Sequence, residues 1–347
     1  MIRRLSALAV ASAALIVAAC GQQTDEAPAD AGVVNLYTAR HYASDEQIYD
    51  AFTEATGIQV RKIEVPADQL VERLKAEGAG SPADVVVIQD AGAMGRAADA
   101  DLLVAFDDAT IDGRVPEQWR DPDGRWFGIA RRARVIAYDT TKVKPEEVDT
   151  YEELASPRFK GKLCVRNSDN SYNLSLMAAL IERWGADKAL EWARGVVANM
   201  ARPPQGADTE QIRAVGAGQC EVAITNHYYY LRLAESDDAA DKALTQKVKL
   251  SFPSLEGRGA HFNLSGAGLA ANAPNRENAI KFLEFLTGPE AQSIFANATN
   301  EFPTVPSTET PPDVGQFMSV PADPLPLHAY STHLAESHRI FEQAGWL

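Results

Sequence analysis

Tyrosine and histidine side chains gather at three places where the sequence predicts that a strand ends. They are Tyr228, Tyr229 and Tyr230 in "EVAITNHYYYLRL", Tyr172 in "KLCVRNSDNSYNLSL", and His41 and Tyr42 in "VVNLYTARHYASDE". A single loop tyrosine usually packs as an amphipathic ring and a single histidine is usually an ordinary hydrogen-bonded residue. The repetition of the pattern at three junctions is therefore what indicates a binding site.

Phenols and an imidazole that meet at one cleft suit a hard, highly charged cation. Phenol has a reference pKa near ~10, so at neutral pH it becomes an anion only when an ion such as a trivalent metal displaces the proton. Anionic oxygens with a neutral imidazole fit iron better than calcium, which prefers carboxylates and carbonyls. Zinc would more often show Cys and His at motif spacing, which this sequence lacks. The donor types therefore favour ferric iron.

The first part of the chain alternates strand and helix patterns. "VVNLY", "IQVRKIEV" and "DVVVIQD" are predicted strands, separated by predicted helices at "SDEQIYDAFTEATG", with Ser44 as N-cap and Gly57 as its stop, and "ADQLVERLKAEG". This β-α-β-α-β order is typical of a parallel sheet with helices on its faces. Ligands of such sheets bind beyond the carboxyl ends of the strands, so the three junctions can converge on one cleft.

The second part predicts another α/β unit, and about 330 residues beyond the leader exceed what one core usually supports. "GRWFGIARRARVIAYDT" reads as a long extended segment between two lobes, and "KVKLSFP" and "AHFNLSGAGLAA" suggest a return to the first lobe. The tail after Thr304 shows no readable period. The expected lobes are residues 33–131 with about 256–300, and residues 132–255 with part of the C-terminal tail.

The tyrosine triplet follows the strand pattern "EVAIT". If a helix begins at Asn226 or His227, successive side chains lie about 100° apart instead of on opposite faces. Tyr228 and Tyr229 can then both reach the cleft, while Tyr230 packs against its lobe or lines the rim.

The N-terminus reads as an export signal. Two arginines precede the apolar stretch "LSALAVASAALIVAA", which is too short and too rich in small residues for a convincing membrane span. It ends in "VAAC", which resembles the lipobox of bacterial lipoproteins and implies that Cys20 is a lipid anchor after removal of residues 1–19. A plain signal peptide cleaved nearby is the alternative. Residues 20–32 are predicted to be a flexible tether.

Charge and cysteine content narrow the partners and the compartment. Without residues 1–19 the chain would keep 31 Lys and Arg against 48 Asp and Glu, a formal charge of −17, which argues against nucleic acid and anionic membrane surfaces as partners. Cys164 and Cys220 are the only possible pair beyond Cys20, and in an oxidising compartment we expect them to form a disulfide. A reactive thiol is the alternative.

Four stretches carry a resemblance that spans nearly the whole exported chain. They are "LYTARHYASDEQIYDAFTEATGI", "CVRNSDNSYNLSLMAALI", "ARPPQGADTEQIRAVGAGQCEVAITNHYYYLRL" and "HFNLSGAGLAANAPNRENAIKFLEFLTGPEAQ". The chain resembles the periplasmic ferric-iron-binding proteins of ABC transporters, the bacterial transferrin-like family, and specifically its cyanobacterial-type branch. The resemblance implies a type II periplasmic binding protein, with two lobes joined by a hinge, each a mixed, mainly parallel sheet flanked by helices.

The most specific motif is Asn, any residue, Tyr, Tyr, which begins here at Asn226. The resemblance implies five metal ligands, which are His41, Tyr42, Tyr172, Tyr228 and Tyr229. The sequence departs from the family by placing Tyr230 where relatives usually carry an aliphatic residue, which leaves the register of the pair open. Four phenolates and a neutral imidazole around Fe³⁺ leave a net charge of about −1, which a nearby cation would offset. Arg40 and Arg202 are the candidates, and either could equally be a surface ion-pair partner.

The resemblance implies an extracytoplasmic protein that binds Fe³⁺ as transported cargo and delivers it to an ABC transporter permease in the inner membrane. We expect a periplasmic monomer, held at the membrane only through Cys20, and not an enzyme. The alternative is a binding protein of the same architecture for a small organic or oxyanion solute. An exported hydrolase is a further alternative, although the sequence shows no nucleophile elbow, zinc motif or P-loop.

Overall fold

The computed structural model describes residues 32–347. The predicted signal peptide, Cys20 and all of the tether except its last residue lie outside this range. Within residues 32–347, no helix is both long and apolar enough to cross a membrane.

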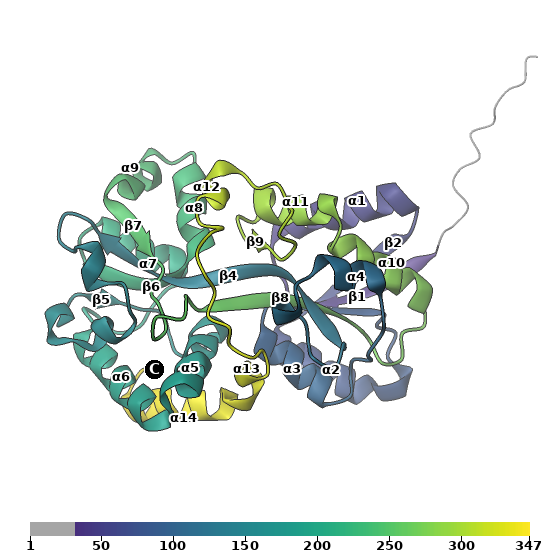
Figure 1. Ribbon diagram of the computed structural model, residues 1–347, viewed down its shortest axis with the longest axis horizontal. Helices are drawn as coiled ribbons and strands as arrows, with labels where there is room; N and C mark the ends of the chain where they lie inside the picture. The colour runs from purple at the N-terminus through teal and green to yellow at the C-terminus, as the bar shows by residue number, and fades with distance from the viewer. Residues whose placement is uncertain (1–31) are drawn as a thin grey trace, which may run out of the picture.

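In the described part of the chain, nine strands form the sheet structure, and they lie in two lobes (Figure 1). In chain order they are β1 Val33–Thr38, β2 Gln59–Glu64, β3 Val85–Ile88, β4 Trp126–Asp139, β5 Leu163–Cys164, β6 Val222–Asn226, β7 Val248–Ser251, β8 Phe262–Leu269 and β9 Phe302–Pro303. The order across the sheet is β2-β1-β3-β8-β4-β6-β5, with β7 and β9 paired to β4. The expected two-lobed α/β architecture is confirmed.

Strand β4 runs from one lobe into the other. Its first half pairs with β8 and its second half pairs with β6 and β7, all antiparallel. The extended segment predicted to run between the lobes is therefore confirmed. Parallel pairing between the strands is confined to the outer ladders β2-β1-β3 and β5-β6, because β4 and β8 cross between the lobes in opposite directions. The sheets are mixed as expected, but the expectation that they are mainly parallel is wrong, since β3, β6, β7, β8 and β9 all take part in antiparallel ladders. The predicted division at residues 131 and 132 falls within β4 and stays a prediction.

Helices cover both faces of the sheet in each lobe (Figure 1). Those of the first lobe are α1 Glu46–Thr56, α2 Ala67–Glu77, α3 Ala91–Asp99, α4 Ala109–Arg114, α10 Arg276–Leu286 and α11 Pro289–Ala298. Those of the second lobe are α5 Ser171–Trp184, α6 Ala186–Asn199, α7 Asp208–Gly216, α8 His227–Glu235 and α9 Ala239–Lys247. The tail adds α12 Pro312–Gly315, α13 Ala329–Thr332 and α14 Leu334–Ala344.

The start of α1 differs from the prediction. A short 3₁₀ turn, Ala43–Asp45, precedes the helix, and Asp45 rather than Ser44 occupies the N-cap position. Its carboxylate does not cap the helix, because it accepts hydrogen bonds from Arg40 at 2.8 Å. The helix ends as predicted at Gly57, whose φ of 75° lies in the left-handed region that glycine tolerates.

The C-terminal tail forms helices that the sequence pattern did not reveal. Helix α14 packs on α5 and α6, and α13 lies between α3 of the first lobe and α5 of the second. The Tyr330 hydroxyl of α13 donates to the carbonyl of Phe262 at the start of β8. The tail thus contacts both lobes at the base of the cleft between them.

The structure joins Cys164, at the end of β5, to Cys220, just before β6. These strands are parallel neighbours, which brings the two Cα atoms to 5.8 Å, within the usual range for a disulfide. The expected disulfide is confirmed, and it fixes the two strands whose following segments carry Tyr172 and the tyrosine triplet.

Candidate metal centre

The tyrosine triplet opens helix α8 directly after strand β6. Asn226 is still extended, with φ −89° and ψ 144°, and the helix begins at His227, as predicted. The Asn226 side chain does not cap this helix, because its Oδ1 accepts from the Arg134 guanidinium at 3.1 Å. The change from strand to helix places Tyr228 and Tyr229 in the first turn, where both can face the cleft.

Three phenol oxygens from three separate segments meet at one point. The Tyr228 hydroxyl lies 3.1 Å from that of Tyr42 and 3.2 Å from that of Tyr172. The remaining pair, Tyr42 and Tyr172, is 3.5 Å apart. Tyr42 follows strand β1 of the first lobe, Tyr172 opens α5 of the second lobe, and Tyr228 opens α8. The two lobes therefore meet at a triangle of hydroxyl groups.

The other two tyrosines of the triplet take different directions. The Tyr229 ring packs against the Tyr228 ring with centroids 4.3 Å apart, and it is partly exposed. The Tyr230 hydroxyl instead donates to the carbonyl of Thr245 in α9 at 3.1 Å. This geometry favours Tyr228 and Tyr229 over Tyr230 as the pair that serves the cleft.

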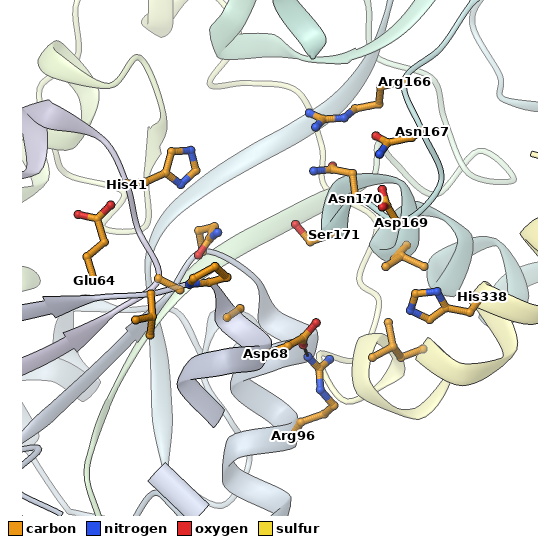
Figure 2. A pocket seen from close by; sticks show the side chains of 17 residues that line it. His41, Glu64, Asp68, Arg96, Arg166, Asn167, Asp169, Asn170, Ser171 and His338 are labelled. Carbon is orange, nitrogen blue, oxygen red and sulfur yellow. Dashed lines mark hydrogen bonds and ion pairs between the residues drawn. The ribbon is translucent and has the colours of Figure 1, made fainter. Parts of the chain in front are cut away.

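His41 lies at the edge of a cleft beside the phenols. Its ring is exposed and its centroid is 4.9 Å from that of Tyr42. The adjoining cavity has a volume of about 510 Å³ and is lined by residues of both lobes, His41 and Glu64 on one side and Arg166 and Asn170 on the other (Figure 2). His41 is thus the candidate donor that reaches solvent, whereas Tyr228 is fully buried.

Guanidinium groups surround the tyrosine rings. Arg40 lies 4.8 Å and Arg232 5.1 Å from the centroid of the Tyr42 ring, and Arg232 also lies 4.8 Å from that of Tyr228. The Tyr172 ring has three such neighbours, at 5.4 to 5.9 Å, which are Arg132, Arg134 and Arg166. Each contact is attractive to the ring face, and the positive charge also stabilises a phenolate.

Burial and charge act against each other on these phenols. Burial raises the pKa of Tyr42 well above its usual value, Tyr172 and Glu301 raise it further, and Arg132 lowers it. Burial likewise raises the pKa of Tyr228, with the same opposing effect of Arg132. The pKa of Tyr229 is also raised, first by burial and then by the neighbouring Tyr172. These groups stay neutral at physiological pH unless a strongly charged cation displaces their protons.

The two arginines named from the sequence lie in different places. Arg40 is buried over Tyr42, but two carboxylates compensate its charge, because it pairs with Asp45 at 2.8 Å and Glu301 at 2.9 Å. Arg202 donates to Gln211 of α7 at 2.9 Å and to the adjacent carbonyl of Pro203. The structure brings Arg40 to the phenols, whereas the contacts of Arg202 lie around its own loop. The charge-compensating role of each stays a prediction.

Sequence reasoning missed the charges behind the phenols, chiefly the buried Arg132, Arg134 and Glu301 and the half-buried Arg232. Arg132 and Arg134 lie in "IARRARVIA", the central part of β4, and both are almost completely buried. Arginines inside an apolar strand are unusual, because a buried charge needs a partner. That pattern could have marked β4 as part of the site. Glu301 had no comparable signal in its local sequence.

The donor set depends on phenol oxygens. Among residues 32–347, no group of three or more His, Cys, Asp and Glu side chains is arranged to hold a metal ion. The convergence of buried hydroxyls, backed by arginines that stabilise their anionic form, fits a trivalent cation that displaces phenol protons. It does not resemble the carboxylate and carbonyl cages of calcium sites.

The fold and the cleft between two lobes are those of a solute-binding protein. Residues 47–322 match the family of bacterial extracellular solute-binding proteins, and the chain belongs to that family.

Its relatives include iron-uptake proteins. Iron uptake protein A1 of Synechocystis sp. is 43% identical over 345 residues, covering 98% of this chain and 96% of the relative. The structure of Trichodesmium IdiA (FutA) in complex with iron and citrate ligands has a TM-score of 0.85 at 45% identity, covering 91% of this chain and 100% of that one. The ferric binding protein from Campylobacter jejuni also has a TM-score of 0.85, at 33% identity and with coverages of 90% and 100%. These similarities confirm the resemblance found in the sequence.

Proposed function

We propose that this protein captures Fe³⁺ between its lobes, with Tyr42, Tyr172, Tyr228, Tyr229 and His41 as ligands, and serves iron uptake. The observation that carries the proposal is the meeting of three phenol oxygens, 3.1 to 3.5 Å apart, from segments of both lobes. The names of the relatives support it, since they describe iron uptake and ferric binding proteins.

Each ligand has a distinct part in capture. Tyr172, Tyr228 and Tyr229 come from the second lobe and present a preformed set of oxygens, and the packing of the Tyr228 and Tyr229 rings against each other helps to fix their positions. Tyr42 and His41 come from the first lobe, so only approach of the lobes completes the set. Closure follows because the closed form binds the ion more tightly than the open form.

The cargo loses its water shell and each coordinating phenol loses a proton. The surrounding arginines stabilise the phenolates that form, and the low exposure of Tyr228 and Tyr172 keeps water away from the oxygens. Protons compete with the ion for the phenolates, so acid weakens binding.

The proposal extends to the cellular setting. The protein acts as a binding protein and not as an enzyme, and the iron-loaded lobes dock on an ABC transporter permease in the inner membrane. It is a periplasmic monomer, anchored through lipidated Cys20 after removal of residues 1–19. Membership of an extracellular solute-binding family supports export.

The test is addition of ferric citrate to the purified, metal-free protein. A visible charge-transfer band from tyrosinate to iron is expected, with one iron bound per chain and a fading of the band on acidification. Tyr230→Phe serves as the matched control, because this neighbouring phenol bonds to α9 and should leave the band unchanged. Absence of both the band and bound iron would refute the proposal, and a thermal shift with small organic anions alone would favour the alternative solute.

A further inference from the structure

Three consecutive residues between α11 and β9 support the groups behind the phenols. The carbonyl of Thr299 accepts from Arg232 at 3.1 Å. Asn300, with a left-handed φ of 57°, places its carbonyl 3.1 Å from the Nε2 of His227, the residue before Tyr228. The next residue is Glu301. This short segment of the first lobe therefore contacts the start of α8 in the second lobe.

Glu301 is a fully buried carboxylate shared by two arginines. Its Oε2 accepts from Arg40 at 2.9 Å and from the Thr299 hydroxyl at 3.1 Å. Its Oε1 lies 3.6 Å from a guanidinium nitrogen of Arg132 and has no hydrogen-bond partner among residues 32–347. Arg40 stands over the Tyr42 ring and Arg132 over the Tyr172 ring. Glu301 thus lies between two arginines, each of which stands over the ring of a proposed ligand, and the two ligands belong to different lobes.

Glu301 remains ionised in this position. Burial alone would raise its pKa, but Arg40 and Arg132 outweigh burial and hold the pKa below its usual value. Its negative charge therefore acts on the site at neutral pH.

The charges around the phenols are net positive before the cargo binds. Five arginines lie over the tyrosine rings, which are Arg40, Arg132, Arg134, Arg166 and Arg232, and three carboxylates pair with them, which are Asp45, Asp208 and Glu301. This leaves +2 next to neutral phenols. On the proposed function, four protons leave as one trivalent ion enters, so binding makes the centre one unit more negative. The arginines favour that change and Glu301 opposes it.

We propose that Glu301 is a positioning residue that holds Arg40 and Arg132 behind the phenols and limits the affinity of the site for Fe³⁺, so that the ion can be released. The inference rests on the proposed function, because its sign follows from four phenolates around one ferric ion. Without Glu301 the arginine charge would be less compensated, and the iron-loaded centre would be stabilised further.

The decisive variant is Glu301→Gln, which keeps an oxygen acceptor for Arg40 and removes the charge. Iron is partitioned between the protein and excess citrate at neutral pH and quantified by the charge-transfer band. We expect about tenfold tighter retention, the order of magnitude for one unit charge acting at short range in a protein interior. Glu301→Ala removes the acceptor as well, so Arg40 loses a bond, and this variant should retain iron less tightly than Glu301→Gln.

Asp323→Asn is the matched control for loss of a buried charge. Asp323 is also buried and forms an ion pair, but its partner is Arg183 of α5. This variant should lower the melting temperature and leave the partition of iron unchanged. A purely structural role of Glu301 would give the same pattern, because it would affect stability and not the partition.

The possible results distinguish failure of the role of Glu301 from failure of the proposed function. If folded Glu301→Gln shows an intact band and retains iron as tightly as the wild type, the role of Glu301 is overturned and the proposed function still stands. Equal retention by Glu301→Gln and Glu301→Ala would overturn its positioning part. If Glu301→Gln does not fold, Arg132→Gln tests the same charge balance by removing a positive charge, so this variant should retain iron less tightly than the wild type. Retention equal to or tighter than that of the wild type would overturn the proposed role of Glu301. A wild-type protein that takes up no iron refutes the proposed function and this inference with it.

Discussion

Replacement of Tyr228 by Phe removes the hydroxyl that lies closest to both of its neighbours. The aromatic ring remains, so its packing against Tyr229 and beneath Arg232 is preserved. The substitution therefore isolates the oxygen, which contacts Tyr42 at 3.1 Å and Tyr172 at 3.2 Å.

Two quantities should change in Tyr228→Phe, which are the free energy of unfolding and the number of protons released on iron binding. Two neutral hydrogen bonds are lost, each about 0.5–1.5 kcal/mol, so the free energy of unfolding without metal should fall by about 1–3 kcal/mol. Iron binding should release about three protons per ion instead of about four, because one displaceable phenol proton is gone.

The number of protons released on iron binding can be measured at neutral pH because the pKa of Tyr228 is shifted upwards. Burial raises the pKa of Tyr228 in the folded protein above the unfolded value near ~10. The shift therefore costs stability only as the pH rises past that value, and the phenol is protonated in both states at neutral pH. Protons released on addition of iron then come from metal binding and not from ordinary titration.

The assay adds ferric citrate to each protein in weak buffer and follows a pH indicator together with the visible band. Tyr230→Phe is the control: its phenol donates one hydrogen bond, to Thr245. It should lose about 1 kcal/mol of stability and keep the wild-type proton count. A wild-type proton count and full band intensity in Tyr228→Phe would refute the assignment of Tyr228 as a ligand.

Three further predictions concern stability. Replacement of Cys164 and Cys220 by Ser opens a loop with a sequence separation of 56. The free energy of unfolding should fall by roughly 4 kcal/mol in denaturant titrations, and an unchanged unfolding midpoint would contradict this prediction. Burial lowers the pKa of His261 to about 3, so its folded pKa lies below the unfolded value of about 6.5, and its contribution to stability should fall by about 1.4 kcal/mol per unit as the pH drops from ~6.5 towards ~3. His261→Gln should reduce the slope of stability against pH by that amount in unfolding curves recorded from neutral to mildly acid pH, with the contribution of the similarly buried His227 remaining, and an identical slope would argue against it. Gly95→Ala would put a methyl group 2.9 Å from the Ser331 hydroxyl of α13 and should lower the melting temperature by an overpacking cost of about 1–3 kcal/mol, which Ser331→Gly should relieve.

Much of the fold was predictable because it depends on local patterns. The apolar run at β3 is buried throughout, and the helix predicted after β6 begins at His227. The N-cap of α1 was mispredicted by one residue because the 3₁₀ turn Ala43–Asp45 includes Ser44 and moves the start of the helix to Glu46. Helix α14 was overlooked although its amphipathic pattern is local, with Ile340 and Phe341 on the buried side. Only the structure reveals that it packs on α5 and α6, which lie more than a hundred residues earlier.

The candidate site was predictable in its donor types and less so in its environment. Tyr42, Tyr172 and Tyr228 each follow a recognisable strand end, and the sequence alone indicated phenol chemistry suited to a ferric ion. The electrostatic environment was not readable, because Glu301 lies 261 residues from Arg40 along the chain and yet accepts a hydrogen bond from it.

The sequence by itself determined which groups could do chemistry here and at which junctions they stand, because residue types and strand ends are local properties. Tertiary structure decided which phenols meet, that Tyr230 turns away to α9, and that Glu301 is held between Arg40 and Arg132. Those outcomes depend on distances between distant segments, and burial and charge act through such distances. The same buried phenol has different properties beside a guanidinium and beside a carboxylate, and only the folded chain specifies its neighbours.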